Sequence, residues 1–363
     1  MVQSVYIHIP FCVKKCKYCS FVSFESLQNK KGYLYSLLKE IDYYYKGEPL
    51  KTFYIGGGTP SVMSVDELGK IVNKFEFEPD CERTIELNPN DVTEELARGL
   101  KVLGFNRVSL GSQSFDDKIL ELIGRRHSSD EIVGAVETLK ECGFENISLD
   151  LIYGLPTQTI NGFESDLQRV FELDVQHISL YGLKIDEGSY FYTHLPENLP
   201  DDDKQADMYL LANKLVRENG FEHYEVSNYA KPGFNSRHNT NYWLCGEYYG
   251  FGVSAHGYED GVRYSNTANL SEYMNDPVSR EYGEFLTAQK QLEERIFLGF
   301  RLEEGLDVQS INNDFGIDFE KKYSNVLRKY SDYFIKTDKG YKLSNDNEKN
   351  GFLMSNIILS EFL

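Results

Sequence analysis

Six short runs of apolar and β-branched residues alternate with helical patterns in the first half of the chain. Helix start and stop signals separate them, including the capping boxes Ser64 with Glu67 and Ser128 with Glu131, and Gly143 after a helix end. Repeated βα units form a parallel sheet wrapped by helices, so this order predicts an α/β fold. Six units favour a partial (β/α)6 barrel of the TIM type over a closed barrel of eight strands. The runs cover residues 5–9, 52–55, 84–87, 107–110, 146–151 and 177–181.

The pattern changes after residue 181. An acidic turn leads into a predicted helix over residues 205–219, and residues 259–261 carry a hairpin turn signal, Glu-Asp-Gly. The last part of the chain reads as helices followed by a short hairpin over residues 333–344. We therefore expect three parts: a barrel over residues 1–220, a connecting region over 221–285 and a small winged-helix-like α+β domain over 286–363.

Composition and charge narrow the class of protein further. Hydrophobic residues make up 41% of the 363 residues, which is typical of a folded chain with a buried core. The net charge of −19 repels phosphate backbones, so no nucleic acid partner is expected. Residues 285–363 hold 11 basic and 13 acidic residues, which favours structure or partner docking over DNA binding. Without a transmembrane run or an amino-terminal signal, we expect a cytoplasmic protein.

Chemically useful residues collect where the predicted strands end, which is where parallel βα folds place their sites. Any one of these residues fits an ordinary exposed loop, but five consecutive strand ends together indicate a site. They are Cys12, Cys16 and Cys19 after the first strand, Gly56 to Pro60 after the second, Glu86 in the third, Gln113 after the fourth and Asp150 in the fifth.

The three cysteines are the most specific of these signals. Thiolates on one short loop can each bind one iron of a four-iron cluster, which leaves the fourth iron open to a small molecule. The alternative is a zinc-stabilised binding module whose site is completed by His8 or a distant residue, although zinc loops usually have a two-residue gap. The run Gly56 to Gly58 fits neither a phosphate-binding loop nor a dinucleotide fingerprint, so it predicts either a close approach to a ligand or a structural turn.

Four motifs resemble a known family. The chain is similar to radical S-adenosylmethionine (SAM) proteins of the oxygen-independent coproporphyrinogen oxidase type, and the resemblance runs through most of its length. It implies a [4Fe-4S] cluster whose open iron is chelated by the methionine end of SAM, and cleavage of SAM to a 5′-deoxyadenosyl radical. The motifs are residues 6–12 with Cys16 and Cys19, Gly56-Gly-Gly-Thr-Pro60, Glu86-Leu-Asn-Pro89 and Gly111-Ser-Gln-Ser-Phe115.

The resemblance assigns roles residue by residue. It gives Cys12, Cys16 and Cys19 to the cluster. Arg125 can pair with a carboxylate, Glu86 can accept from an ammonium and Asp150 can bind ribose hydroxyls. From the residues alone, Arg125 also fits an exposed arginine and Asp150 a helix cap. The positions implied to contact SAM are Tyr6, Tyr18, Gly57, Gly58, Thr59, Glu86, Gln113, Arg125, Asp150, Gly182 and His256.

Two branches of this family differ at residues that can be read here. The oxidases carry a further cysteine at the position of Phe21 and have a longer amino-terminal extension. Residues 238–243, His-Asn-Thr-Asn-Tyr-Trp, resemble the motif of the heme chaperone branch. His238 can ligate heme iron and aromatic neighbours can pack on the macrocycle, whereas the plainer interpretation is a hydrogen-bonded core histidine. Cys245 is a rival ligand, although a small buried hydrophobe is its more ordinary role.

The resemblance therefore implies a heme chaperone of porphyrin metabolism, which binds heme and passes it to heme-accepting apoproteins. The rival is an oxygen-independent coproporphyrinogen III oxidase, an enzyme that decarboxylates propionates by radical chemistry. The implied cofactors are the [4Fe-4S] cluster, SAM and heme. The sequence assigns no catalytic residue, and it leaves open a homodimer, respiratory enzymes as acceptors, and whether SAM is cleaved.

Overall fold

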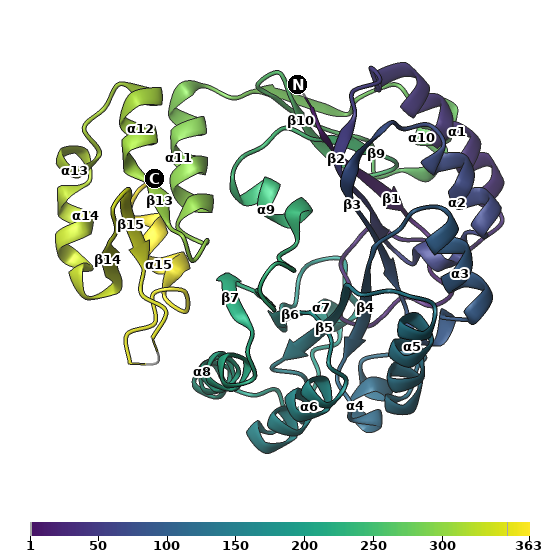
Figure 1. Cartoon of the computed structure of the whole chain (residues 1–363), viewed down its shortest axis with the longest axis horizontal. Coiled ribbons are helices and arrows are strands. Elements are labelled where there is room, and N and C mark those ends of the chain that lie inside the picture. Colours follow the sequence, from purple (N-terminus) through teal and green to yellow (C-terminus); the bar gives the residue numbers. More distant parts are fainter. Residues whose placement is uncertain (1, 347) are drawn as a thin grey trace.

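The computed structural model describes residues 2–346 and 348–363. Its centre is a sheet in which six parallel strands lie side by side in chain order, β6-β5-β4-β3-β2-β1. The sheet curves into a partial barrel (Figure 1), which confirms the predicted fold class. Each predicted run lies within or overlaps one of these strands. They are β1 (Ser4–Ile9), β2 (Leu50–Gly57), β3 (Phe77–Leu87), β4 (Arg107–Gln113), β5 (Ile147–Tyr153) and β6 (His177–Gly182).

Three further strands extend this sheet at its two edges. β9 pairs in parallel with β1, while β8 pairs antiparallel with β6 and β7 with β8. The expected connecting region thus contributes to the central sheet. These strands are only three or four residues long, too short for a period of two to stand out in the sequence. They are β7 (Glu222–Glu225), β8 (Asn228–Ala230) and β9 (Tyr249–Phe251).

Helices cover the outer face of the barrel, as Figure 1 shows. Both predicted capping boxes are present, because Ser64 and Ser128 each accept from the backbone three residues on while Glu67 and Glu131 reach back. Gly143 follows its helix with a positive φ of 84°. The helices are α1 (Lys30–Tyr44), α2 (Val65–Val72), α3 (Glu94–Val102), α4 (Asp117–Leu122), α5 (Ser129–Glu141), α6 (Ile160–Glu172) and α8 (Asp202–Glu218). The short helix α7 (Tyr190–Thr193) instead contacts the cysteine loop, where the Phe191 amide donates to the Lys17 carbonyl at 2.9 Å.

The two faces of the parallel sheet have opposite chemistry. Alternate side chains such as Val5, Phe53 and Ile85 are fully buried in one apolar core with the outer helices. The residues between them point to the concave side and are largely polar, including Ser109 and Asp150. Because side chains alternate across a strand, one sequence pattern builds the core and the lining of an inner cavity together.

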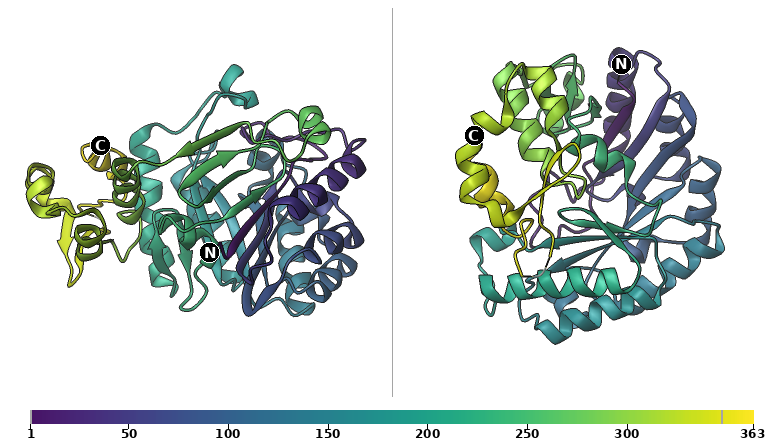
Figure 2. Two further views of the ribbon diagram at one scale, coloured as in Figure 1. Left: turned by 90° about the horizontal axis from the view of Figure 1, so that it is seen from above. Right: turned by 60° about the vertical axis from the view of Figure 1, so that its left-hand side comes forward.

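The rest of the chain completes the concave side and adds a small domain (Figures 1 and 2). Helix α9 (Arg237–Trp243) lies inside the open barrel, and β10 (His256–Glu259) forms a hairpin with β11 (Val262–Ser265) through the predicted Asp-Gly turn. Both turn residues have positive φ, 51° and 76°, as a tight two-residue hairpin requires. Then come α10 (Leu270–Asn275) and β12 (Tyr282–Phe285).

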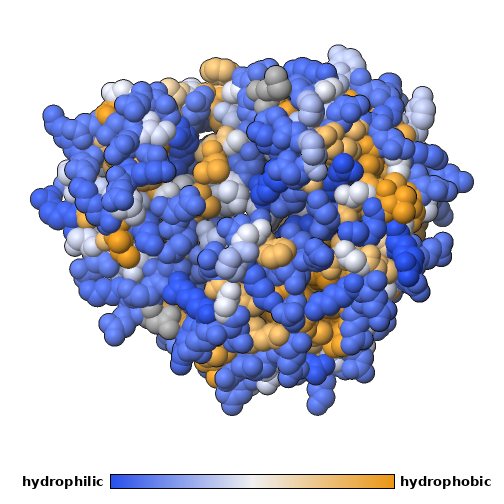
Figure 3. All heavy atoms as spheres, viewed as in Figure 1, coloured by the Kyte–Doolittle hydropathy of each residue, from blue (hydrophilic) through white to orange (hydrophobic). Residues whose placement is uncertain are grey.

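The carboxyl-terminal domain has its own apolar core, centred on Phe300, Phe319 and Phe362. Its three-stranded antiparallel sheet and short helices confirm the expected small α+β domain. Across the described residues, no helix has the length and apolar character that crossing a membrane requires. The face in Figure 3 is mostly hydrophilic. The elements are α11 (Ala288–Gly299), β13 (Leu306–Asp307), α12 (Val308–Phe315), α13 (Phe319–Lys322), α14 (Ser324–Lys329), β14 (Phe334–Lys336), β15 (Gly340–Leu343) and α15 (Ser355–Ser360).

Candidate functional site

A cavity of about 380 Å³ opens at the carboxyl ends of the parallel strands. All three motif cysteines line it, and so do nine of the eleven residues expected to contact SAM. The structure therefore brings together residues that are spread over most of the barrel sequence. The nine residues are Tyr18, Gly57, Gly58, Thr59, Glu86, Gln113, Arg125, Asp150 and Gly182.

Neighbouring side chains donate to two of the cysteine sulfurs. The Thr59 hydroxyl lies 3.6 Å from Cys12 Sγ, and Arg125 Nη1 lies 3.3 Å from Cys16 Sγ. All three thiols are free. Burial raises the pKa of Cys12, and it raises the pKa of Cys19 to about 11. Binding of iron must therefore release protons from these thiols, since the thiolate is the ligand.

The arrangement of donors fits a cluster better than a single zinc ion. Among the described residues, no three His, Cys, Asp or Glu side chains converge as the ligands of one ion must. His8, one candidate for completing the alternative zinc site, has both ring nitrogens in contact with other groups: Nδ1 is 3.0 Å from the Tyr6 hydroxyl and Nε2 is 2.9 Å from the Val22 carbonyl. A four-iron cluster needs only one thiolate at each of three irons.

The glycine run is required by close packing at the cavity edge. A Cβ at Gly58 would lie 2.6 Å from the Phe11 carbonyl oxygen, and Gly57 has a φ of 111° with the His8 ring directly beside it. A Cβ at Gly56 would meet the Glu86 carboxylate at 2.8 Å. The run therefore serves as a structural turn and also brings backbone to the cavity surface, while its close approach to a ligand stays a prediction.

The carboxylates of the cavity are held by neighbouring donors. Glu86 accepts from the Tyr54 hydroxyl at 2.7 Å and from the Gly57 amide at 3.0 Å, and burial raises its pKa to about 7. Asp150 accepts from the Ser109 hydroxyl at 2.9 Å. It lies within β5, so it is no helix cap. Gln113 ends β4 with a φ of 67°, a backbone conformation that is uncommon for non-glycine residues.

Arg125 is not a freely exposed arginine. Its guanidinium also donates to Asn88 Oδ1 at 2.6 Å and to the Gly111 carbonyl, which anchors it above β4. Deeper in the cavity lies Arg107, which is 1% exposed and whose Nε has no hydrogen-bond partner. Sequence reasoning missed Arg107 and Ser109 as cavity residues, although they occupy alternate positions of one strand with Gly111 and Gln113 of the motif. Because side chains two residues apart on a strand point to the same face, the position of Gln113 could have indicated the other cavity residues of β4.

A second cavity of about 560 Å³ adjoins the first and shares Phe21, Tyr54, Glu86, Tyr181 and Asn239 with it. The remaining two residues expected to contact SAM line this cavity rather than the first: Tyr6 and His256. Its other walls are largely aromatic and come from β1, α9 and the segment before β9. They include His8, His238, Tyr242 and Tyr248.

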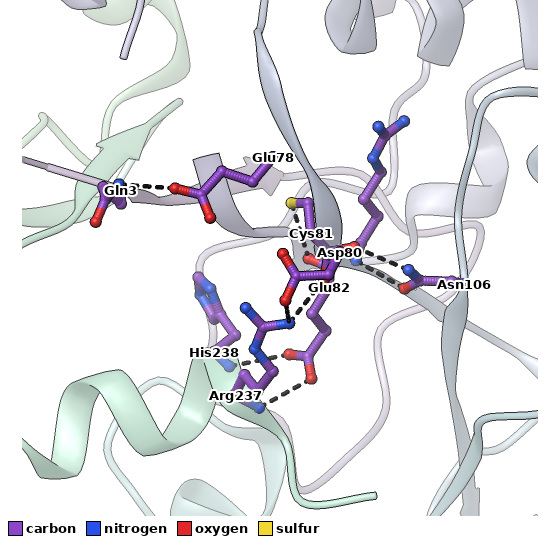
Figure 4. Close-up of polar contacts among 9 residues, drawn as sticks. Gln3, Glu78, Asp80, Cys81, Glu82, Asn106, Arg237 and His238 are labelled. Atoms are coloured by element: carbon purple, nitrogen blue, oxygen red, sulfur yellow. Dashed lines mark hydrogen bonds and ion pairs between the residues drawn. The ribbon is translucent and has the colours of Figure 1, made fainter. Parts of the chain in front are cut away.

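His238 is held firmly at the start of α9. Glu82 accepts from the backbone amides of Arg237 and His238, both at 2.9 Å (Figure 4). The imidazole contacts the Thr52 hydroxyl through Nδ1 at 2.9 Å and the Tyr242 hydroxyl through Nε2 at 2.7 Å. It is 1% exposed. As placed here, His238 is a fully hydrogen-bonded core histidine, the plainer of the two sequence interpretations.

Trp243 lies apart from this cavity. It borders a different hollow with residues of the carboxyl-terminal domain, and the Arg301 guanidinium lies 5.9 Å from its ring. One helical turn separates His238 from Tyr242, which places these two on one face and turns Trp243 away. Cys245 is partly buried beside Tyr242 and Tyr248 in a further small hollow.

The partial barrel, the three cysteines and the cavity at the strand ends together define a radical SAM protein. Residues 6–170 match the radical SAM superfamily and residues 286–348 match the HemN C-terminal domain. The fold is similar to coproporphyrinogen III oxidase (HemN) from Escherichia coli. Its TM-score is 0.87 at 23% identity, over 99% of this chain and 90% of that one.

Relatives found by sequence comparison define the family more narrowly than the fold does. Heme chaperone HemW from Lactococcus lactis subsp. lactis is 39% identical over 98% of both chains. HemW from Bacillus subtilis is 36% identical over 90% of both, and HemW from Escherichia coli is 35% identical over 80% of this chain and 78% of that one. This chain belongs to the HemW family of heme chaperones, within the radical SAM superfamily. A [4Fe-4S] cluster and SAM follow from that superfamily.

Replacing any one of Cys12, Cys16 or Cys19 by Ala should abolish formation of a stable cluster, because three protein thiolates are the minimum for this arrangement. The measurement is iron and sulfide content with the visible absorption spectrum after anaerobic reconstitution. Cys142→Ala is the matched control, since Cys142 is also free but ends α5 away from the cavity. Undiminished iron in the three variants would contradict the assignment.

Gly58→Ala should distort the cysteine loop, because the new Cβ would press on the Phe11 carbonyl. We expect a loss of about 1 to 3 kcal/mol in the free energy of unfolding, together with poorer cluster reconstitution. Gly134→Ala is the control: it lies inside α5 with nothing within 4 Å, so it should stabilise by about 0.5 to 1 kcal/mol. Urea unfolding of both variants measures the difference.

Glu86→Gln should change how stability depends on pH. Glu86 holds its proton up to about pH 7 in the folded protein but only to about 4.5 when unfolded. Its stabilising contribution is therefore complete below pH 4.5 and is lost as pH rises through 7. Relative to the parent, the free energy of unfolding of Glu86→Gln should therefore rise by about 2 kcal/mol between pH 5 and pH 8. Urea titrations at several pH values, with the exposed Glu95→Gln as control, measure this shift.

Proposed function

We propose that this protein is a heme chaperone that binds heme in the second cavity and transfers it to hemoproteins lacking their heme. The observation that carries the proposal is the aromatic cavity with three histidines in its walls, directly beside the cavity of the cysteine loop. A porphyrin needs flat apolar walls and an iron ligand, and this cavity offers both kinds of group. The relatives named heme chaperone support the same conclusion.

The first cavity is the proposed site of the cluster and SAM. The three cysteines would hold three irons of the cluster, which would supply one-electron chemistry to SAM bound at its open iron. Arg125 would pair with the SAM carboxylate, and its contact with Cys16 would keep that carboxylate beside the cluster. Glu86 would accept from the SAM ammonium, and Asp150 would bind the ribose hydroxyls.

The two cavities are proposed to influence each other through their common wall. Tyr54 donates to Glu86 on the side of the first cavity and stacks on His238 on the side of the second, with ring centroids 5.0 Å apart. A positive charge beside Glu86 favours its carboxylate form, which strengthens the hydrogen bond from Tyr54. SAM binding therefore has a direct route to the aromatic wall of the heme cavity.

The chaperone proposal also accounts for Phe21. This side chain is 67% exposed at the rim that both cavities share, at the position where the oxidases resembled in sequence carry a further cysteine. An exposed phenyl ring suits contact with a flat apolar cargo. We propose a cytoplasmic location and hemoproteins as the acceptors, as expected from the sequence.

The test combines heme titration with transfer. The reconstituted full chain should form a stoichiometric complex with heme, observed as a Soret band, and should then pass the heme to an apo hemoprotein separated by affinity tag. Phe21→Ala should weaken heme binding, whereas Phe285→Ala, an equally exposed phenylalanine that lines neither cavity, should not. Absence of a complex would refute the proposal, and anaerobic turnover of coproporphyrinogen III would favour the oxidase instead.

A further inference from the structure

Six of the seven histidines of this chain have ring contacts within the protein. His8 and His238 in the second cavity each use both nitrogens, as described above. Elsewhere, His127, His177 and His223 accept or donate hydrogen bonds in the interior, and His194 stacks on Tyr190 at 4.2 Å. An imidazole in such contacts must give one up before it can bind a metal ion.

His256 is the exception. It begins β10 and lines the second cavity with an exposed ring, and within the described residues that ring makes no hydrogen bond, ion pair or aromatic contact. The positive charge that acts on this ring is that of Arg263, whose guanidinium pairs with both carboxylate oxygens of Glu294. Burial and Arg263 lower the pKa of His256, so the ring is neutral at pH 7, the form that binds metals.

The backbone that presents His256 is fixed by close packing. Gly250 lies against the His256 carbonyl, and Gly252, with a φ of 103°, would place a Cβ 2.7 Å from the His8 carbonyl. Between them and His256, Ser254 has a φ of 60° and donates its amide to Thr267 at 2.8 Å. These contacts hold the segment before His256 in one conformation. A ligand on so rigid a segment is well positioned.

The cavity in front of His256 suits a large flat molecule. Tyr6, Tyr54, Tyr181, Tyr242 and Tyr248 all border it. Its volume of about 560 Å³ lies within the range of pockets that hold ligands of this size. An imidazole at one side of an aromatic cavity is one arrangement that binds a macrocycle with a central iron.

We propose that His256 supplies the imidazole nitrogen that ligates heme iron in the second cavity, while His238 shapes the wall of that cavity through Thr52, Tyr242 and Tyr54. The inference rests on the proposed function and adds the identity of the iron ligand to it. It also gives His256 a role other than the SAM contact that the family resemblance implied, because His256 does not line the first cavity.

The test uses the full chain and ferric heme. His256→Ala should lose the absorption and electron paramagnetic resonance signature of imidazole ligation, with at least a tenfold weaker Kd for heme, and free imidazole should restore the signature. His238→Gln, which keeps a hydrogen-bonding side chain, should retain it. His194→Ala controls for exposed histidines outside the cavity. Circular dichroism and cluster iron content show that each variant is folded.

The outcomes separate this inference from the proposed function. If the parent binds heme but His256→Ala keeps the imidazole signature, while His238→Gln or His238→Ala loses it, the ligand is His238 and the inference is wrong, although the chaperone proposal stands. If the parent forms no complex with heme, both are wrong. Restoration by imidazole in His256→Ala alone supports the assignment, because a structural role would not respond to a free ligand.

Discussion

The alternation of side chains along six parallel strands is the constraint on which the rest of this molecule depends. One set of alternate residues packs with the outer helices into a continuous apolar core, and burial of that core holds the barrel together. The other set faces the concave side and carries hydroxyl, carboxylate and guanidinium groups. In a closed barrel of eight strands, apolar layers would fill this interior. Here the barrel stays open, so the same geometry provides a cavity that carries these polar groups.

The cysteine loop is positioned by this framework rather than by its own sequence. The Cys12 amide donates to the Phe24 carbonyl at 3.1 Å, and the Lys17 amide donates to the end of α4, at Ile123, at 3.0 Å. Thr59 from the glycine turn and Arg125 from beyond α4 then reach the sulfurs. The loop that would hold a metal cluster is thus braced by the first, second and fourth βα units. The barrel must form for these donors to meet.

Much of this could be predicted from the sequence. The βα period, both capping boxes, the Asp-Gly hairpin and the small last domain all have local signals that the structure confirms. The edge strands β7 to β9 could not be predicted, because they are short and because β8 and β9 pair with β6 and β1, which are distant in the chain. The same limit applies to the site. Cys12, Glu86 and Arg125 could be identified from motifs, whereas the neighbours of His238 and the free ring of His256 emerge only in three dimensions.

The position of β9 bears on the order in which the chain can fold. Val5 near the amino terminus pairs with Tyr249, so one edge of β1 has no partner strand until β9 has been synthesised. Until that segment leaves the ribosome, β1 can align only with β2, and the wall bearing His256 does not exist. The cysteines near the start are therefore synthesised long before their neighbouring cavity is complete. The second cavity can therefore be completed only after the cysteine loop and most of the barrel have been synthesised.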